Sequence, residues 1–340
     1  MWLTPAARQL RSTRTAGGNL ISNGIIFADS NSGLDSPSGL AFDNNGNLYV
    51  ANFQNNTILE FTNSGGTLST NATVFANTGL DAPYGLAFDT AGNLYAANYL
   101  NGTIEKFAYT AGMLSHSGTT VISSGVQNPT GLAFDRSGNL YVAKLVGFGD
   151  CTIEQFTNSG GILSTNGTTF ADSLDSPFSL VFDVRGNLYY TDIYGCAIGI
   201  FTNTDGILNG TWAAFANLGQ NNPTGLAISE AGTLYVAYTG VSMVFSTNAI
   251  IEKFSSTGAD LGQFAVTGNR PFSMAFQPSI RVPLSIKWSG TNVVLMWTDP
   301  SFALQATFTI NGSFTNIPDA TSPYTNFMAG SQQFFRLQKN

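Results

Sequence analysis

Charged side chains, histidine and cysteine are scarce in this sequence. Only 10% of its 340 residues are charged, and it has a single histidine and two cysteines. One histidine and no cysteine pair at ligand spacing argue against a zinc site. A Ser-His-Asp triad would have to use His116, which we expect to be an exposed loop residue. No run of 18 apolar residues occurs, so we expect no membrane-spanning helix.

The few charges are unevenly distributed. Residues 15–269 contain 5 Lys+Arg and 18 Asp+Glu, a balance of −13, while the other 8 basic and 2 acidic residues lie near the two ends. An acidic central region argues against a nucleic-acid partner. The low charge, together with abundant Gly, Asn, Ser and Thr, is typical of secreted bacterial repeat proteins. We therefore expect an extracellular or cell-surface monomer.

The N-terminal residues bear on whether the protein is exported. Residues 1–8 lack the apolar core of a signal peptide. Either the protein is not exported, or the chain as given has lost its start. We favour the second interpretation, because the chain begins inside a repeat unit, as described below.

What the sequence does contain is a repeat. The motif Pro-x-Gly-Leu-Ala-Phe-Asp returns, in whole or in part, at spacings of 46, 46, 48, 46 and 48 residues, starting at Pro37, Pro83, Pro129, Pro177, Pro223 and Pro271. A period this steady indicates a repeat architecture.

One repeat unit contains four apolar runs of strand length. They cover residues 39–42, 48–51, 57–61 and 73–76, and they are rich in β-branched and aromatic residues. The tetrad 43–46, Asp-x-x-Gly, predicts a type I turn between the first two runs. No sustained period near 3.6 is present, so we expect no helices in this region.

Four antiparallel strands in about 46 residues is the size of one β-propeller blade. The extended motif Pro-x-Gly-Leu-Ala-Phe-Asp-x-x-Gly-Asn-Leu-Tyr-Val-Ala, with Thr-Ile-Glu-Lys-Phe at residues 103–107, resembles NHL-repeat propellers over residues 9–277. The resemblance implies an all-β propeller. It says little about function, because such propellers include binding scaffolds and several types of enzyme.

The two ends of the repeat region are complementary fragments of a blade. Register places residues 9–13 over a third strand and residues 19–28 over a fourth, while residues 270–277 supply only a first strand. We predict that they combine into a sixth, composite blade with a short or missing second strand, because closure removes exposed sheet edges. The predicted domains are a six-bladed propeller over residues 1–278 and a small β module over residues 279–340.

The residue after each repeat proline alternates between small and aromatic. The three aromatic residues, Tyr84, Phe178 and Phe272, come from alternate units, and Ser38, Thr130 and Thr224 lie between them. We predict that the aromatic rings converge at the mouth of the central channel. They either fill a narrow channel or form an aromatic platform for a ligand.

A second variable position ends the second strand of each unit. It carries Asn52, Asn98, Lys144, Asp192 and Tyr238, which we expect on the same face as the aromatic mouth. Variation on a constant framework fits a surface that is free to differ, and it also fits a surface tuned to a ligand. We therefore include these five residues with the three aromatic residues as candidate ligand contacts.

Other reactive residues have structural interpretations. Asp43, Asp89, Asp135 and Asp183 occupy the hairpin turns at the opposite end of the blades, and Glu105, Glu154 and Glu252 lie on third strands, away from the axis. Cys151 and Cys196 precede the third strands of adjacent units. We expect them to be free thiols, because equivalent points on adjacent blades are too far apart for a disulfide; the alternative is a bridge, since the extra residues 147–150 could bend one loop toward the other.

Residues 279–340 leave the repeat pattern. Runs at 284–288 and 293–297 flank Ser-Gly-Thr-Asn, which predicts a hairpin, and further strands are expected at 303–310, 314–317 and 334–337. The segment resembles a small β-sandwich module that is appended to many secreted bacterial proteins.

Two functions remain open. The main prediction is a non-catalytic scaffold, without catalytic residues or cofactors, that binds a protein, peptide or polysaccharide at the channel mouth. The alternative is implied by a resemblance to gluconolactonase-type propellers, which hold a divalent cation with oxygen ligands. In that case Asn52, Asn98 and Asp192 would contribute oxygens to Ca²⁺, although no glutamate is evident at the mouth.

Overall fold

The structure is a computed structural model that describes most of the chain. The described residues are 1–4, 9–12, 15–16, 19–20, 25–64, 67–147, 150–218, 221–239, 249–267, 271–277, 285–289, 292–297, 302–307, 313–327 and 334–339. The chain divides into two compact units, one made of Met1–Asn63 and Leu68–Pro278 and the other containing Ser279–Asn340. In the described ranges, no helix is long and apolar enough to cross a membrane.

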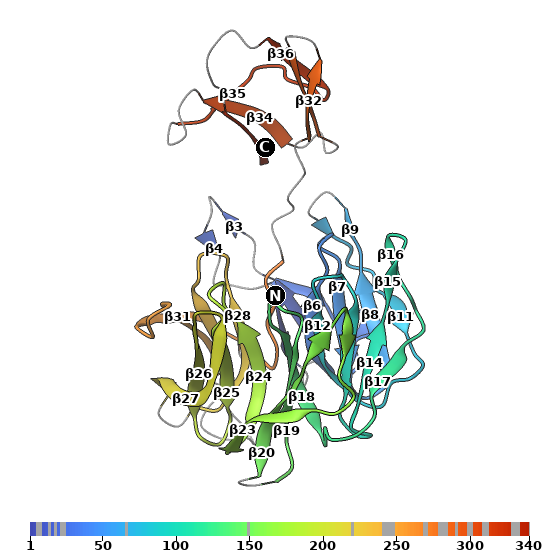
Figure 1. Cartoon of the computed structure of the whole chain (residues 1–340), viewed down its shortest axis with the longest axis vertical. Helices are drawn as coiled ribbons and strands as arrows, with labels where there is room; N and C mark the ends of the chain where they lie inside the picture. The colour runs from blue at the N-terminus through green and yellow to red at the C-terminus, as the bar shows by residue number, and fades with distance from the viewer. Residues whose placement is uncertain are drawn as a thin grey trace. The chain divides into compact units, whose positions relative to one another are not determined.

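The first unit is an all-β propeller whose described part contains five four-stranded antiparallel sheets (Figure 1). We number these sheets as blades 1 to 5. Blade 1 contains β6 (Pro37–Phe42), β7 (Leu48–Asn52), β8 (Thr57–Phe61) and β11 (Thr73–Ala76). Blade 2 contains β12 (Pro83–Phe88), β13 (Leu94–Asn98), β14 (Thr103–Phe107) and β17 (Thr119–Ile122). Blade 3 contains β18 (Pro129–Phe134), β19 (Leu140–Lys144), β20 (Cys151–Phe156) and β23 (Thr168–Leu174).

Blade 4 contains β24 (Pro177–Phe182), β25 (Leu188–Asp192), β26 (Ala197–Thr204) and β27 (Ile207–Asn217). Blade 5 contains β28 (Pro223–Ile228), β29 (Leu234–Tyr238), β30 (Ile250–Phe254) and β31 (Asp260–Val266). In Figure 1 the first strands β6, β12, β18, β24 and β28 lie toward the middle of the unit, with β11 and β17 on one flank and β27 and β31 on the other. The four strands predicted for each unit are therefore present.

A further three-stranded sheet forms at the N-terminus. It contains β1 (Trp2–Thr4), β2 (Gln9–Ser12) and β5 (Ile25–Ala28), in the order β1-β2-β5. Met1 and Ala275 exchange two hydrogen bonds, of 2.7 Å from the N-terminal ammonium and 3.1 Å from the Ala275 N–H. Leu10 and Ala28 are buried in one cluster with Leu48, and Ala275 packs against that cluster. Segments from the two ends of the repeat region therefore meet.

A repeated aromatic contact joins successive blades. The tyrosine in the second strand of one blade packs edge-on or tilted against the phenylalanine that ends the first strand of the next. Ring centroids are 5.4 Å apart for Tyr49–Phe88 and 4.8 Å apart for Tyr95–Phe134. The same contact joins Tyr235 of blade 5 to Phe276, at 5.0 Å. Because each tyrosine fills a gap between two sheets, these contacts fix the order of the blades.

The motif glycine allows neighbouring first strands to approach closely. A Cβ atom on Gly39 would lie 2.2 Å from the carbonyl oxygen of Tyr84, and one on Gly85 would lie 2.0 Å from that of Thr130. No side chain fits at such a distance, so blades 1 and 2 need glycine at this motif position, whereas blade 4 carries Ser179 there.

In blades 1 to 4, the hairpin turn after the first strand is tied to the end of the third strand. In blade 3, Asp135 accepts hydrogen bonds from the backbone N–H of Ser137 and Asn139 at 2.9 Å each, and from the Asn139 amide at 2.7 Å. The oxygen of the same amide accepts the N–H of Asn158 at 2.8 Å. Blades 1, 2 and 4 repeat this arrangement around Asp43, Asp89 and Asp183. The four aspartates are therefore structural, and the partner asparagines extend the role that the sequence suggested.

Within its described residues, the second unit contains two three-stranded sheets. One has the order β32-β33-β36, and the other β35-β34-β37. Their bounds are β32 (Ser285–Ser289), β33 (Asn292–Met296), β34 (Phe302–Thr307), β35 (Thr315–Asn316), β36 (Tyr324–Phe327) and β37 (Phe334–Lys339). Val293, Leu295, Trp297 and Leu304 form its buried core. The predicted hairpin is present, although its turn residues 290–291 lie outside the described residues.

We predict that Asn139→Ala lowers the free energy of unfolding by about 1–3 kcal/mol, because it leaves the Asn158 N–H and an Asp135 oxygen without their partner. Urea denaturation followed by tryptophan fluorescence measures the change. Ser137→Ala is the matched control, since Ser137 is exposed in the same turn and its backbone bond is kept. Equal stabilities of the two variants would contradict the structural role of Asn139.

Candidate functional site

Aromatic rings gather at one mouth of the central channel, as the alternation predicts. Tyr84 and Phe178 have ring centroids 5.3 Å apart, and Phe178 and Phe272 are 6.0 Å apart. Phe53 and Tyr99 extend the group, each within 6 Å of Tyr84. Burial raises the pKa of the Tyr84 hydroxyl above its ordinary value. Ligand binding by these rings stays a prediction.

The small residues that alternate with the aromatic residues, such as Ser38 and Thr224, form hydrogen bonds that the sequence did not reveal. The Ser38 hydroxyl donates to the carbonyl oxygen of Pro83 at 2.9 Å, and the Thr224 hydroxyl donates to that of Pro271 at 2.6 Å. Each hydroxyl therefore links its own blade to the start of the repeat unit that follows. The alternation reflects both this link and the room that the neighbouring rings need.

Asn52 and Asn98 hold loops rather than pointing into open space. The Asn52 side-chain oxygen accepts the N–H of Asp35 at 3.1 Å, and its amide donates to Gly33 and to Thr57. Asn98 makes the equivalent bonds to Asp81, Gly79 and Thr103. Both side chains are completely buried. Their contacts favour a structural role, and binding of a ligand by them stays a prediction.

Asp192 replaces these asparagines in blade 4. One carboxylate oxygen accepts the N–H groups of Ser176 at 3.1 Å and Gly195 at 2.9 Å, and only 7% of the residue is exposed. Burial raises the pKa of Asp192, and the nearby Asp175 carboxylate adds to this effect, whereas the backbone N–H groups oppose it. The carboxylate is therefore held in place by the backbone at a cost in solvation.

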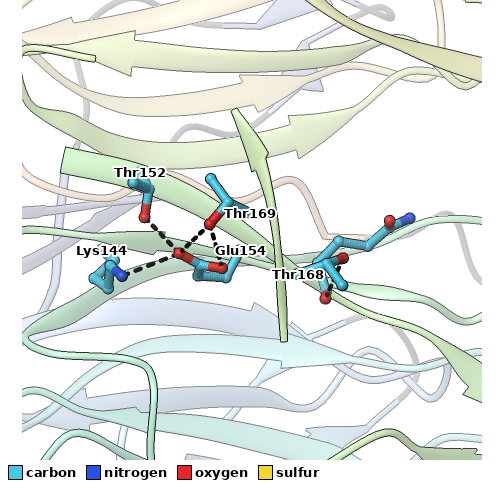
Figure 2. A network of polar contacts seen from close by, with 6 residues as sticks. Lys144, Thr152, Glu154, Thr168 and Thr169 are labelled. Carbon is cyan, nitrogen blue, oxygen red and sulfur yellow. Dashed lines mark hydrogen bonds and ion pairs between the residues drawn. The ribbon is translucent and has the colours of Figure 1, made fainter. Parts of the chain in front are cut away.

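Lys144 replaces the asparagine in blade 3 and makes a different network. Figure 2 shows its ammonium pointing to Glu154, with an Nζ to Oε1 distance of 3.0 Å. The hydroxyls of Thr152 and Thr169 donate to the same carboxylate, at 2.8 and 3.3 Å. Glu154 is buried, so the network neutralises a charge that would otherwise be costly. In blade 5 the position is filled by Tyr238, which is completely buried.

A pocket of about 470 Å³ opens at the same mouth. Its lining comes from blades 2 to 5 and from Phe272: Tyr99, Asn128, Leu145, Val146, Gly147, Cys151, Asp175, Ser176, Phe178, Ile193, Tyr194, Thr224, Thr239 and Phe272. Two of the predicted contacts, Phe178 and Phe272, belong to it. The volume is typical of small-molecule sites.

Most of the pocket residues were missed by sequence reasoning. A signal exists, however, because the residue directly after each second strand is Phe53, Tyr99, Leu145, Ile193 or Thr239, where a polar loop residue is expected. The sequence-based prediction instead selected the preceding residue, which is the last residue of the second strand. In blades 1, 2 and 4 that side chain is directed to the preceding loop, and in blades 2 to 5 the next residue contributes to the pocket.

The cysteines and the histidine do not assemble a reactive group in the described chain. Cys151 and Cys196 are both free thiols. Burial raises the pKa of Cys196, and the Asp192 carboxylate contributes further. The exposed His116 makes a 2.6 Å contact between its Nδ1 and the carbonyl oxygen of Phe75 in the neighbouring blade. His116 thus ties two blades together on the outside of the ring.

A cation site is not evident among the described residues. They contain no group of three or more His, Cys, Asp or Glu that could hold a metal ion. This finding does not test the prediction that the protein has no cofactor, because asparagine and backbone oxygens also bind Ca²⁺.

Comparison with known proteins supports an NHL-like propeller. The family model described as "NHL repeat" matches residues 34–61. A search of curated proteins finds no match.

Solved structures match over about three quarters of the chain. A gluconolactonase from Xanthomonas campestris is 17% identical, with a TM-score of 0.53, and the match covers 77% of this chain and 82% of that protein. A calcium-binding regucalcin from Agrobacterium tumefaciens is 15% identical, with a TM-score of 0.54 and coverages of 76% and 81%. A virginiamycin B lyase from Staphylococcus aureus is 15% identical, with a TM-score of 0.50 and coverages of 76% and 76%. At these identities the likeness shows the fold.

The comparisons contradict the main functional prediction. A non-catalytic scaffold was expected, but the similar structures named above include a lactonase and a lyase. The prediction rested on the absence of an assembled reactive group in the sequence. It was wrong to draw a function from that absence, and the alternative of a lactonase-type propeller is better supported.

We predict that Asp192→Asn flattens the dependence of stability on pH above about pH 4. The pKa of Asp192 is higher in the folded protein than in the unfolded chain, so its contribution is fully present below the unfolded value, near 3.9, and is lost as the pH rises through the folded value. Urea denaturation between pH 4 and 7 measures the slope.

The exposed Asp172 in β23 of the adjacent blade 3 provides the control. Asp172→Asn is expected to keep the wild-type slope. Parallel curves for wild type and Asp192→Asn would show that the titration of Asp192 does not contribute to the pH dependence of stability.

Proposed function

We propose that this protein is a lactonase-type hydrolase that opens a cyclic ester in the pocket at the channel mouth. The observation that carries the proposal is the exposed Asp175 in the lining of a predominantly apolar pocket that also contains Phe178 and Phe272. The similarity of fold to a gluconolactonase supports the reaction class.

The hydrogen bonds of Asn52, Asn98 and Asp192 show whether their side-chain oxygens are available to hold a divalent cation. The oxygens of Asn52 and Asn98 accept backbone N–H groups, and one oxygen of Asp192 accepts two. Turning them toward a cation would leave these buried N–H groups without partners. The three residues therefore do not fit as a ligand set, and we derive no step through a cation.

Asp175 is the group that fits a general base. In the proposed reaction its carboxylate takes a proton from a water molecule while the water oxygen bonds to the ester carbonyl carbon. The tetrahedral intermediate then breaks the ring C–O bond, and the alkoxide receives the proton back from Asp175, which yields a hydroxy acid. Asn128 lines the same pocket, and in the proposed reaction its side-chain amide donates to the developing oxyanion.

We predict that Asp175→Asn lowers kcat/KM for lactone hydrolysis by about 10²–10⁴, the usual contribution of a general base. Acid release from δ- and γ-lactones, followed with a pH indicator, measures the rate. Asp172→Asn removes an exposed carboxylate of the same strand region and is expected to keep full activity.

Two results would contradict this proposal. One is a lactone panel without hydrolysis above the buffer rate, and the other is an Asp175→Asn variant as active as wild type. Running the assay with Ca²⁺ and with a chelator tells whether a cation takes part through groups other than the three tested above.

We also propose that the N-terminal sheet and residues 271–277 form a sixth blade that closes the ring. Three contacts support this proposal: the hydrogen bonds between Met1 and Ala275, the ring contact between Tyr235 and Phe276, and a bond from the Gln277 amide to the Gly46 carbonyl in blade 1, at 3.4 Å. A central cavity of about 90 Å³ is lined by the first strands of all five blades and by residues 272–274.

We predict that Leu10→Ala destabilises the propeller by about 2–5 kcal/mol, as a large-to-small change in a core does. Leu10 is completely buried in the cluster that contains Leu48. Thermal and urea unfolding measure the loss, and Leu48→Ala in blade 1 serves as the reference. A neutral Leu10→Ala would mean that the N-terminal sheet is not an integral blade.

A further inference from the structure

The pocket lining points to the chemical class of the substrate. We infer that the pocket binds a lactone that carries an apolar alkyl or aryl arm, and that it disfavours a polyhydroxylated sugar lactone. This inference rests on the proposed function, and it depends on the pocket walls rather than on the reacting group.

The walls of the pocket are apolar where a substrate arm would lie. Leu145, Val146 and Ile193 provide aliphatic surface, and Phe178 and Phe272 provide aromatic surface. Phe178 packs against both Tyr84 and Phe272, so this aromatic surface is continuous with the group at the channel mouth. Such surfaces bind alkyl and aryl groups through burial of apolar area.

The exposed surface of the pocket is predominantly apolar, and two of its hydroxyl groups are already engaged. The Thr224 hydroxyl donates to Pro271, and the Thr239 hydroxyl donates to Asn222 at 3.4 Å. Among the described lining residues there is no Lys or Arg. A sugar lactone with several hydroxyls would lose its hydration on these walls and find few partners, which is costly. Asp175 and Asn128 together provide enough polar groups to bind one ester group.

The apolar surface continues outward from the pocket along three blades. The second residue after the second strand is Leu100 in blade 2, Val146 in blade 3 and Tyr194 in blade 4, and these residues are 65%, 42% and 48% exposed. Equivalent positions in three adjacent units thus present large apolar groups to solvent. A long alkyl arm would cover this rim, because it extends from the pocket that Val146 and Tyr194 also line.

A binding series tests the inference without relying on catalysis. Alkyl-substituted γ-lactams, in which an amide replaces the ester, are titrated by calorimetry with chains from methyl to octyl. We expect the Kd to fall by about fourfold for each fully buried CH₂, which corresponds to about 0.8 kcal/mol, until the chain leaves the apolar surface. A Kd that does not change with chain length would overturn the inference.

A matched pair of variants locates the effect. Val146→Ser is expected to raise the Kd of the octyl lactam several-fold and to leave that of the methyl lactam unchanged. Val184→Ser is the control, because Val184 is 66% exposed and lies in the hairpin turn of blade 4, away from the pocket lining. Because both valines are on exposed loops, neither change should prevent folding. Equal effects of the two changes would also overturn the inference.

Hydrolysis of the matching lactones separates the two proposals. Wild-type protein is expected to prefer octyl over methyl lactones and over glucono-δ-lactone in kcat/KM. Chain-length-dependent lactam binding without hydrolysis of any lactone would overturn the proposed function and leave the ligand class standing. Efficient hydrolysis of glucono-δ-lactone, with a Kd for the lactams that does not depend on chain length, would support the proposed function and overturn the inferred ligand class.

Discussion

The packing of one sheet against the next is the interaction on which this structure depends. Each sheet is apolar on both faces, so it is stable only between two neighbours. The tyrosine of the second strand, for example Tyr49 against Phe88, fills the space between sheets, and the motif glycine lets the first strands approach at the channel. The mouth pocket exists because this packing places loops of adjacent blades side by side.

The same repeat position has different roles in different blades, and each variation is compensated locally. At the end of the second strand, the asparagines of blades 1 and 2 hold the preceding loop, Asp192 does so as a buried carboxylate, and Lys144 neutralises Glu154. Variation at this position therefore follows from packing within each blade. It is weak evidence for a surface tuned to a ligand, although the position lies beside the pocket.

These observations change the functional interpretation. The scaffold prediction assumed that an enzyme would show its reactive groups in the sequence. The pocket instead combines one exposed carboxylate, Asp175, with apolar walls from several blades. A hydrolase that uses a single carboxylate and binds its substrate mainly through apolar contacts leaves little trace in a motif, and the fold shared with a lactonase is consistent with it.

The sequence alone determined the repeat, the four strands of each unit and the turns, because strand periodicity and Asp-x-x-Gly are local properties. It also indicated that the two ends are complementary and that Tyr84, Phe178 and Phe272 converge. Only the tertiary structure decided which side chains face the pocket, because Asn52 and Ile193 differ by one place in the repeat and yet face a loop and a cavity. Their directions depend on contacts between segments far apart in the chain, which no local pattern encodes.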